Sequence, residues 1–182
     1  MLDVNRLRVI DAVARHGSVT AAARELHYSQ PSVTHHIARL EAETADLVAD
    51  QLRLHLPTPD VLTAGQRLGS PDEYVGHTLH AEPDGSFSIV GLVWRPGQIT
   101  RIHDHVTWCV FGVIQGVEHE ELFDADLDLI GESDNHVGDV SGFAPPGDIH
   151  RVHNTADETA ISIHIYGTDV TRVGSSARRY YD

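Results

Sequence analysis

The most informative part of the chain has the sequence Gly-Gln-Ile-Thr-Arg-Ile-His-Asp-His at residues 97–105. In a β-strand, side chains two residues apart point to the same face. A strand here would therefore project His103 and His105 together and Asp104 to the opposite face. Two imidazoles held side by side on a strand form half of a transition-metal site. Taken alone, such a pair is more often exposed or simply hydrogen-bonded than bound to a metal.

A further histidine follows a turn downstream of this pair. The segment Pro-Pro-Gly-Asp-Ile-His at residues 145–150 places His150 directly after a Pro/Gly turn. Neutral imidazole is the commonest protein ligand for transition metals, and the chain contains 14 histidines. His150 is therefore the candidate for the third ligand.

The regions on both sides of these histidines have the composition of β-strands. Residues 88–94, 107–114 and 160–166 are rich in β-branched and aromatic side chains. Turns rich in proline and glycine separate them, at residues 95–97 and 144–147. Many short strands with turns at regular spacing predict a β-sandwich or barrel.

The spacing of these motifs resembles that of the cupin superfamily. Its first motif is matched by Gly97, five residues, His103-Asp104-His105, three residues, Cys109, six residues and Gly116. The second motif is matched between Gly138 and Asn154, with one additional residue before Pro145-Pro146-Gly147. Most cupins carry a glutamate ligand where this chain has Cys109. The resemblance implies a mainly β fold, the cupin double-stranded β-helix or jelly-roll barrel.

Cysteine in the glutamate position is similar to the pattern of thiol dioxygenases of the cysteine dioxygenase type. The segment Ser-Ile-His-Ile-Tyr at residues 162–166 resembles the Ser-x-His-x-Tyr segment of that family, and the resemblance covers about residues 60–182. It implies that His103, His105 and His150 bind Fe(II). Four further residues would act in catalysis: Tyr166 beside the iron, His164 and Ser162 in a hydrogen-bonded relay to it, and Cys109, which in some members forms a thioether with the tyrosine.

The implied reaction adds both atoms of O2 to the sulfur of a small thiol, of the cysteine or 3-mercaptopropionate type, and yields a sulfinic acid. Three neutral imidazoles leave the ion its full charge and open positions for thiolate and dioxygen. An alternative is a cupin that uses zinc or nickel as a Lewis acid.

The family's carboxylate anchor is missing from its usual place. Members that use cysteine carry an arginine shortly after a tyrosine, and a branch acting on 3-mercaptopropionate carries glutamine there. This chain has Tyr74-Val75-Gly76-His77. We therefore expect another group to bind substrate, and the candidates are His77, Arg101, Arg172 and Arg178, with Trp108 and Trp94 as apolar walls. Each tryptophan can equally be a core residue.

The N-terminal part of the chain has helical periodicity and resembles the start of LysR-type regulators. Leu7, Ile10 and Val13 recur at helical spacing, Gly17 ends that helix, and Ser18 and Ser29 are suitable N-caps for the next two. Residues 7–26 and 29–41 are similar to the family's helix-turn-helix, with the recognition helix in the second range. The residues that would meet base edges are Ser29, Gln30, Ser32, Thr34 and His35.

Charge divides the chain in two. Its net charge is −14, and residues 1–44 contain five arginines and five acidic residues, so the whole excess lies beyond residue 44. An acidic body repels nucleic acid at long range. The resemblance to LysR regulators also stops near Thr44, before their wing and dimerisation helix. These features favour an enzyme over the alternative, a DNA-binding regulator whose cupin senses a thiol, a metal or oxygen.

The division into domains follows from the motifs. We expect a helix-turn-helix segment at residues 1–44 and a cupin thiol dioxygenase domain at 45–182, with a helical lead-in over 45–75 and the barrel over about 76–182. Separate helices are expected around Ala45–Leu56 and Val61–Leu68. The N-terminus lacks the features of a secretion signal, and no apolar run is long enough for a membrane span. We expect a cytoplasmic monomer or homodimer.

Overall fold

The computed structural model describes residues 4–181, so residues 1–3 of the expected N-terminal segment and residue 182 of the expected barrel lie outside the described residues. The helices are α1 (Val4–His16), α2 (Val19–Leu26), α3 (Gln30–His55) and α4 (Val170–Val173), with single 3-10 turns at η1 (Pro59–Val61) and η2 (Gln66–Leu68). The strands are β1 (Val75–Ala81), β2 (Ser88–Trp94), β3 (His103–His105), β4 (Cys109–Gln115), β5 (Val117–Phe123), β6 (Leu129–His136), β7 (Val140–Phe143), β8 (His150–His153), β9 (Ala160–Tyr166) and β10 (Ala177–Tyr180). None of the described helices combines the length and apolarity that crossing a bilayer requires.

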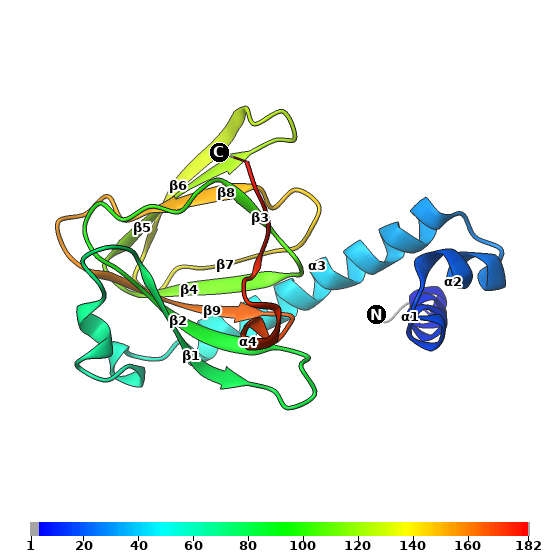
Figure 1. Ribbon diagram of the computed structural model, residues 1–182, viewed down its shortest axis with the longest axis horizontal. Helices are drawn as coiled ribbons and strands as arrows, with labels where there is room; N and C mark the ends of the chain where they lie inside the picture. The colour runs from blue at the N-terminus through cyan, green and yellow to red at the C-terminus, as the bar shows by residue number, and fades with distance from the viewer. Residues whose placement is uncertain (1–3, 182) are drawn as a thin grey trace.

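The strands form two antiparallel sheets that face each other as a barrel (Figure 1). One sheet has the order β1-β2-β9-β4-β7 and the other β10-β3-β8-β5-β6. Strands β2 and β9 match the predicted ranges 88–94 and 160–166, whereas β4 begins at Cys109, two residues later than expected. The predicted fold is confirmed: a cupin double-stranded β-helix that follows a helical segment with a helix-turn-helix.

Side chains from both sheets fill the space between them. Trp94 and Leu92 of β2, Tyr166 of β9 and Val152 of β8 belong to one buried cluster. Such a barrel is a packed core rather than an open channel, because inward-pointing side chains alternate along every strand. The space that remains lies beside the histidines.

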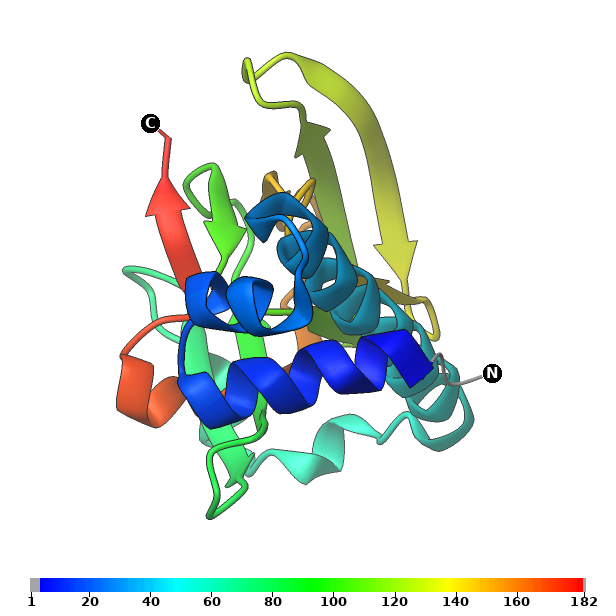
Figure 2. The same ribbon diagram turned by 90° about the vertical axis from the view of Figure 1, so that its right-hand side faces the viewer.

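The three N-terminal helices pack around a small core of their own, and the predicted caps are present. Ser18 and Ser29 accept hydrogen bonds from backbone N–H groups in the first turns of α2 and α3. Gly17 has φ of 58°, which suits the end of a helix. Figure 1 shows α1 and α2 at the end of α3 that is remote from the barrel, and in Figure 2 these two helices lie in front of the barrel.

Helix α3 corrects the expectation of two separate helices. The recognition helix does not end near Thr44 but continues without a break to His55. Its C-terminal half lies on the outer face of the sheet, where Ala45, Ala49 and Leu52 pack against Val110 of β4. These three side chains recur at helical spacing and bury one continuous stripe, and no glycine or proline interrupts them. The predicted boundary between residues 44 and 45 falls inside this helix, so the division into 1–44 and 45–182 stays a prediction.

The expected helix over Val61–Leu68 is also corrected. The segment forms the two 3-10 turns η1 and η2 instead, and Leu62 between them is almost fully buried. Leu62 packs over Gly91 of β2, where an added Cβ would lie 3.1 Å from Leu62 Cδ2. Hydrogen bonds within the two turns and burial of this one leucine hold the segment in place of a continuous helix.

Two glycines of the first cupin motif provide a matched test of packing. Gly97 and Gly116 both have positive φ, of 80° and 72°. A Cβ on Gly116 would lie 2.9 Å from the backbone Cα of Ala160, whereas a Cβ on Gly97 would have nothing within 4 Å. We expect Gly97→Ala to cost about 1 kcal/mol through backbone strain. Gly116→Ala should cost about 1 to 3 kcal/mol more, because backbone cannot yield as a side chain can. Urea denaturation of both variants measures the difference, and equal losses would contradict the contact at Ala160.

Candidate metal centre

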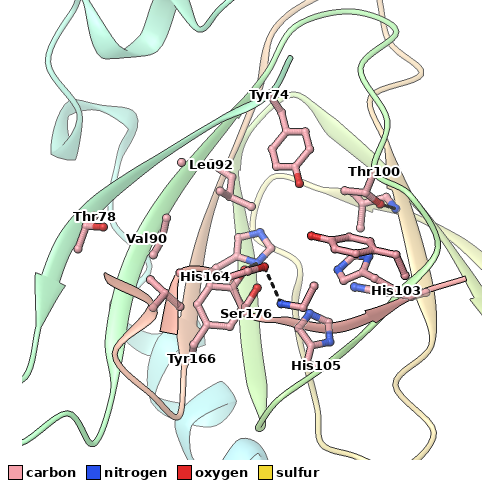
Figure 3. Close-up of a pocket in the computed structure, with 18 of the residues that line it drawn as sticks. Tyr74, Thr78, Val90, Leu92, Thr100, His103, His105, His164, Tyr166 and Ser176 are labelled. Carbon is pink, nitrogen blue, oxygen red and sulfur yellow. Dashed lines mark hydrogen bonds between the residues drawn. The ribbon is translucent and has the colours of Figure 1, made fainter. Parts of the chain in front are cut away.

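Three histidines from two neighbouring strands meet inside the barrel. His103 and His105 lie on β3, and His150 begins β8 directly opposite His103 in the antiparallel register. Their potential ligand nitrogens all lie within 4.8 Å of one another, and all three side chains are buried. Figure 3 shows His103 and His105 beside the same cavity. The structure therefore brings together the three ligands that the motifs predict.

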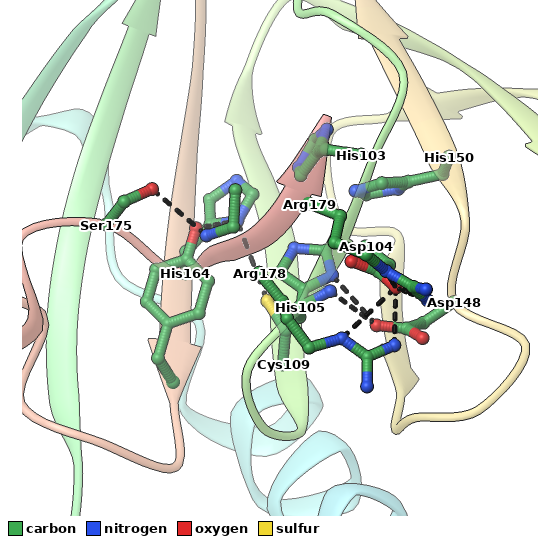
Figure 4. A network of polar contacts seen from close by, with 12 residues as sticks. His103, Asp104, His105, Cys109, Asp148, His150, His164, Ser175, Arg178 and Arg179 are labelled. Atoms are coloured by element: carbon green, nitrogen blue, oxygen red, sulfur yellow. Dashed lines mark hydrogen bonds and ion pairs between the residues drawn. The ribbon is translucent and has the colours of Figure 1, made fainter. Parts of the chain in front are cut away.

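Each of the three rings has its Nδ1 held by an acceptor. His103 Nδ1 lies 3.0 Å from the carbonyl oxygen of Arg101, and His150 Nδ1 lies 2.6 Å from Glu120 Oε1. His105 Nδ1 lies 3.2 Å from Asp148 Oδ2, an interaction drawn in Figure 4. When Nδ1 donates to these oxygens, Nε2 of each ring is left as the lone-pair nitrogen. Acceptors of this kind orient metal-binding histidines in proteins.

The electrostatics of the rings also suit a metal ion. Burial, together with the neighbouring imidazoles, lowers the pKa of His103 and of His150 to about 3. Both rings are therefore neutral at physiological pH, which is the form that binds metals. Three convergent and oriented imidazoles, two of them neutral, fit a transition-metal ion. Among the described residues, no carboxylate or thiolate joins this group of ligand atoms.

Two acidic residues that support the ligands were missed from the sequence. Glu120 and Asp148 are buried behind His150 and His105. Burial raises the pKa of Glu120 to about 7, whereas for Asp148 the hydrogen bonds from His105 outweigh burial and lower the pKa. The sequence did contain one indication that Glu120 points inward. Acidic residues stand at 118 and 120 of one strand, so both lie on the same face and the residue between them faces outward.

The predicted relay is assembled next to the histidines. Ser162 Oγ lies 2.9 Å from His164 Nε2, and Tyr166 Oη lies 3.3 Å from His164 Nδ1. All three residues project inward from β9. Burial lowers the pKa of His164 to about 3 and raises that of Tyr166 well above its ordinary value, so both are neutral.

Cys109 lies beside this relay and is fully buried. It is the register partner of Tyr166 across β4 and β9, and its Sγ is 3.9 Å from His164 Nδ1. Its thiol is free in the structure, and burial raises its pKa well above the ordinary value. The geometry places the sulfur next to Tyr166, as the family resemblance implies.

A cavity of about 330 Å³ opens on the three histidines. Strands β1 and β2 form one wall, with Gly76, Thr78, Val90 and Leu92, and Figure 3 shows the Tyr74 hydroxyl directed into the space. The segment 174–177 and Tyr180 lie at another side. This volume suits a small molecule of a few heavy atoms.

Of the residues expected to bind substrate or form its walls, Trp94 lines this cavity, whereas four do not: Arg172, His77, Trp108 and Arg178. Arg172 forms an ion pair with Asp169 at 3.0 Å and donates to the carbonyl oxygen of Pro83. His77 points to the other face of β1 from Gly76 and Thr78, and Trp108 packs with the cluster under α3. Strand alternation turns His77 away from the site. Arg172 is directed away by its ion pair with Asp169, and Trp108 by its packing under α3.

The fourth of these residues, Arg178, is bound to Asp104. Arg178 and Arg179 both form ion pairs with Asp104 Oδ2, and Tyr181 donates to the same oxygen at 2.9 Å. Figure 4 shows Arg178 and Arg179 converging on this carboxylate. Burial raises the pKa of Asp104, but these donors outweigh it and hold the pKa well below the usual range. Asp104 therefore fastens β10 to β3 on the face opposite the ligands, as the alternation in residues 103–105 predicts.

Glu118 is a fully buried acid near the relay, and it provides a test by pH. Neither of its oxygens has a hydrogen-bond partner. Burial raises its pKa to about 8, although the nearby Ser162 hydroxyl and Trp94 indole lower it slightly. The carboxyl group of Glu118 has an ordinary, lower pKa in the unfolded chain. Between that pKa and about 8, the folded protein keeps a proton that the unfolded chain has lost. This group makes the free energy of unfolding fall as pH rises toward 8, by at most about 1.4 kcal/mol per unit.

We expect Glu118→Gln to flatten this pH dependence. Urea denaturation at pH 5 and pH 8 should show a larger loss of stability for the wild type than for Glu118→Gln. Glu132→Gln, at an exposed position of β6, serves as the control and should follow the wild type. Parallel profiles of the wild type and Glu118→Gln would contradict a neutral buried carboxyl.

The residues expected to contact DNA lie at the start of α3. Ser29, Gln30, Thr34 and His35 are exposed, and Ser32 is half-buried. Ser29 also serves as the N-cap, and Gln30 Nε2 donates to Thr20 Oγ1 at 2.7 Å. The described surface thus leaves most of the predicted recognition residues accessible.

Two family models match the chain, and both expected resemblances are confirmed. The model for cysteine dioxygenase type I matches residues 71–178, and the model for bacterial regulatory helix-turn-helix proteins of the lysR family matches residues 4–51. The second match continues seven residues beyond Thr44, into the part of α3 that packs on the barrel.

Curated relatives are transcriptional regulators. A RuBisCO operon transcriptional regulator of Allochromatium vinosum is 52% identical over 92 residues, which cover 50% of this chain and 29% of the relative. The HTH-type transcriptional regulator SyrM 1 of Sinorhizobium fredii is 40% identical over 171 residues, covering 82% of this chain and 46% of the relative. The chain therefore spans less than half the length of these relatives.

Solved structures with a similar fold include a conserved protein with a double-stranded β-helix domain from Klebsiella pneumoniae. It is 17% identical, with a TM-score of 0.49, and the match covers 59% of this chain and 89% of that one.

Proposed function

The chain belongs to the cysteine dioxygenase type I family through residues 71–178, and from this membership we propose that it is an iron-dependent dioxygenase of a small thiol. The observation that carries the proposal is the group of three buried histidines, whose ligand nitrogens lie within 4.8 Å of one another. A site of three neutral ligands keeps the full charge of a divalent ion, and it leaves coordination positions open for a thiol and dioxygen.

The proposed reaction converts RSH and O2 into RSO2H. Both oxygen atoms become bonded to sulfur, so sulfur is oxidised and dioxygen is reduced without a further reductant. Fe(II) bound by His103, His105 and His150 would supply the redox chemistry and lower the pKa of the thiol. The chain's own contribution is to orient the ligands, exclude water and place proton donors.

Tyr166 is the residue suited to contact the reacting groups. Its ring stacks with His105 at 6.2 Å between centroids, and burial keeps its hydroxyl protonated. His164 Nδ1 fixes the orientation of this hydroxyl, and Ser162 fixes His164 through Nε2. Because His164 is neutral, its two nitrogens have opposite donor and acceptor roles, and a proton shift between them reverses the polarity of the whole relay.

The test is reconstitution with Fe(II) followed by oxygen uptake with cysteine, 3-mercaptopropionate and cysteamine. We expect uptake with at least one of them and both atoms of labelled dioxygen in a sulfinic acid product. Reconstitution with zinc or nickel in parallel examines the Lewis-acid alternative, which predicts no uptake with any metal. Uptake that releases hydrogen peroxide instead of a sulfinate would contradict the proposal.

A second function, DNA binding, is favoured by one feature of the fold. The lysR-type match includes the recognition residues at the start of α3, and the other half of the same helix packs on β4 and β7 of the barrel. A sensing barrel and a DNA-binding segment would thus be connected through the single helix α3. The surrounding charge acts against this function, because the excess of acidic residues lies in the barrel.

A gel shift at low salt with the DNA upstream of the gene tests this second function. Retardation that is lost in a variant with Gln30 and Thr34 replaced by alanine would support it. No retardation at micromolar protein would exclude it.

A further inference from the structure

The residues around the cavity show which kind of thiol it suits, if the proposed dioxygenase function holds. Of the described residues that line it, none is an aspartate, glutamate, lysine or arginine. The wall consists of apolar side chains such as Val90 and Leu92, and of hydroxyl groups such as those of Tyr74, Ser176 and Tyr180. Hydroxyl oxygens accept hydrogen bonds from an amine as readily as they donate to other groups.

The arginines near the cavity are bound to other groups outside it. Arg178 and Arg179 are held by Asp104, and Arg172 by Asp169. The guanidinium of Arg101 lies over the ring of Tyr180, 4.7 Å from its centroid, and lines a neighbouring hollow rather than the cavity. Releasing one arginine from the Asp104 cluster would remove a charged donor from a buried carboxylate, which is unfavourable.

The titratable groups that stand directly behind the three histidines are carboxyl groups. Asp148 and Glu120 are buried in contact with His105 and His150. The body of the protein beyond residue 44 also carries the whole net charge of −14. A ligand carboxylate would lose its hydration here without gaining a cationic side chain, whereas an ammonium group can donate hydrogen bonds to the hydroxyl oxygens of the wall.

We propose that the cavity takes a small thiol that carries an amine and no carboxylate, an aminoalkanethiol. The sulfur lies toward the three histidines, and the amine meets the hydroxyl-bearing wall. Selectivity arises from the lining, which offers hydroxyl acceptors to an amine and no cationic side chain to a buried carboxylate.

Gly76 offers a direct way to reverse this selectivity. It lies on the cavity wall in β1, and an added Cβ would be 3.2 Å from Leu92 Cδ2 and 3.4 Å from Val90 Cγ1. Both atoms are ends of side chains, so a longer residue needs only small adjustments. Gly76→Arg places a guanidinium next to the space, and Gly76→Met adds comparable length without charge.

The experiment measures binding and turnover separately, on the full chain loaded with Fe(II). Calorimetry under argon gives the affinities for cysteamine and 3-mercaptopropionate, and an oxygen electrode gives kcat/KM for each. We expect the wild type to favour cysteamine at least tenfold in both measurements. Gly76→Arg should shift the ratio at least tenfold toward 3-mercaptopropionate, while Gly76→Met should weaken both thiols without shifting the ratio.

The outcomes separate the two proposals. If cysteamine binds more tightly but no thiol supports oxygen uptake, the dioxygenase function fails and the ligand class stands. Equal affinities, a preference for 3-mercaptopropionate, or binding of neither thiol would overturn the ligand class, even if oxygen uptake occurs.

Discussion

We expect His103→Ala to abolish both iron binding and oxygen uptake. The three rings form a nearly equilateral triangle, in which the centroid of His103 lies 4.9 Å from that of His105 and 4.6 Å from that of His150. Two imidazoles without the third leave an incomplete site in a buried, apolar setting, where water is a poor substitute. Iron after reconstitution and desalting should fall from about one ion per chain to a trace. Activity should fall by more than the roughly hundredfold that loss of a supporting residue causes.

His136→Ala is the matched control for this substitution. His136 is an exposed histidine at the end of β6, so its removal should leave both iron content and oxygen uptake unchanged. Glu120→Gln serves as an intermediate case, because it weakens only the support of His150 and should lower iron affinity about 10- to 100-fold. Normal iron binding by a folded His103→Ala protein would refute the three-histidine site.

Trp94→Ala is expected to cause the largest loss of stability among single core substitutions. Trp94 is 1% exposed, and its ring stacks on Tyr74 with centroids 4.4 Å apart. Its indole N–H donates to Ser162 Oγ at 3.3 Å, and its carbonyl oxygen accepts from Asn154 Nδ2. Removal of a fully buried tryptophan leaves a large cavity and costs about 3 to 5 kcal/mol.

Trp94→Phe separates the ring from its hydrogen bond. Phenylalanine retains most of the apolar contact and lacks the donor to Ser162, so its cost should be less than half that of alanine. Far-UV circular dichroism during urea denaturation measures both variants, because it does not depend on tryptophan emission. A loss below about 1 kcal/mol for Trp94→Ala would contradict the close packing of this core.

These two residues show different limits of sequence interpretation. The ligand role of His103 follows from spacing within one strand and a recognisable second motif. For Trp94 the sequence leaves core and cavity wall as alternatives. In the structure it does both, since it belongs to the buried cluster and also borders the cavity.

The acidic residues behind the ligands show why the support of a site is harder to predict than the site. Glu120 is 30 residues from His150 in sequence, and Asp148 is 43 residues from His105. No local pattern links them, because the pairing depends on which strands become neighbours in the sheet. The alternation at Glu118 and Glu120 indicates two inward acids but not that only one of them reaches a histidine.

The arginines show the same limit for charge. Arg178 resembles a free cation near the end of the chain, yet it is held by Asp104, 74 residues away. This pairing exists because β10 lies beside β3 at the edge of the second sheet. The described lining of the cavity therefore contains no arginine, which a list of arginines in the sequence does not reveal.

Helix α3 illustrates the remaining difference. Residues 29–41 have the local pattern of a recognition helix, and residues 45–56 have a second helical pattern. The structure shows that both belong to one continuous helix, whose Ala45, Ala49 and Leu52 pack against the outer face of the barrel. Strand period, helix caps and histidine spacing involve residues within a few positions of one another, so the chain alone specified the barrel, the helix-turn-helix and the three ligands. The partners of buried charges, the lining of the cavity and the reach of α3 emerged from folding, because they depend on contacts between segments that are distant along the chain.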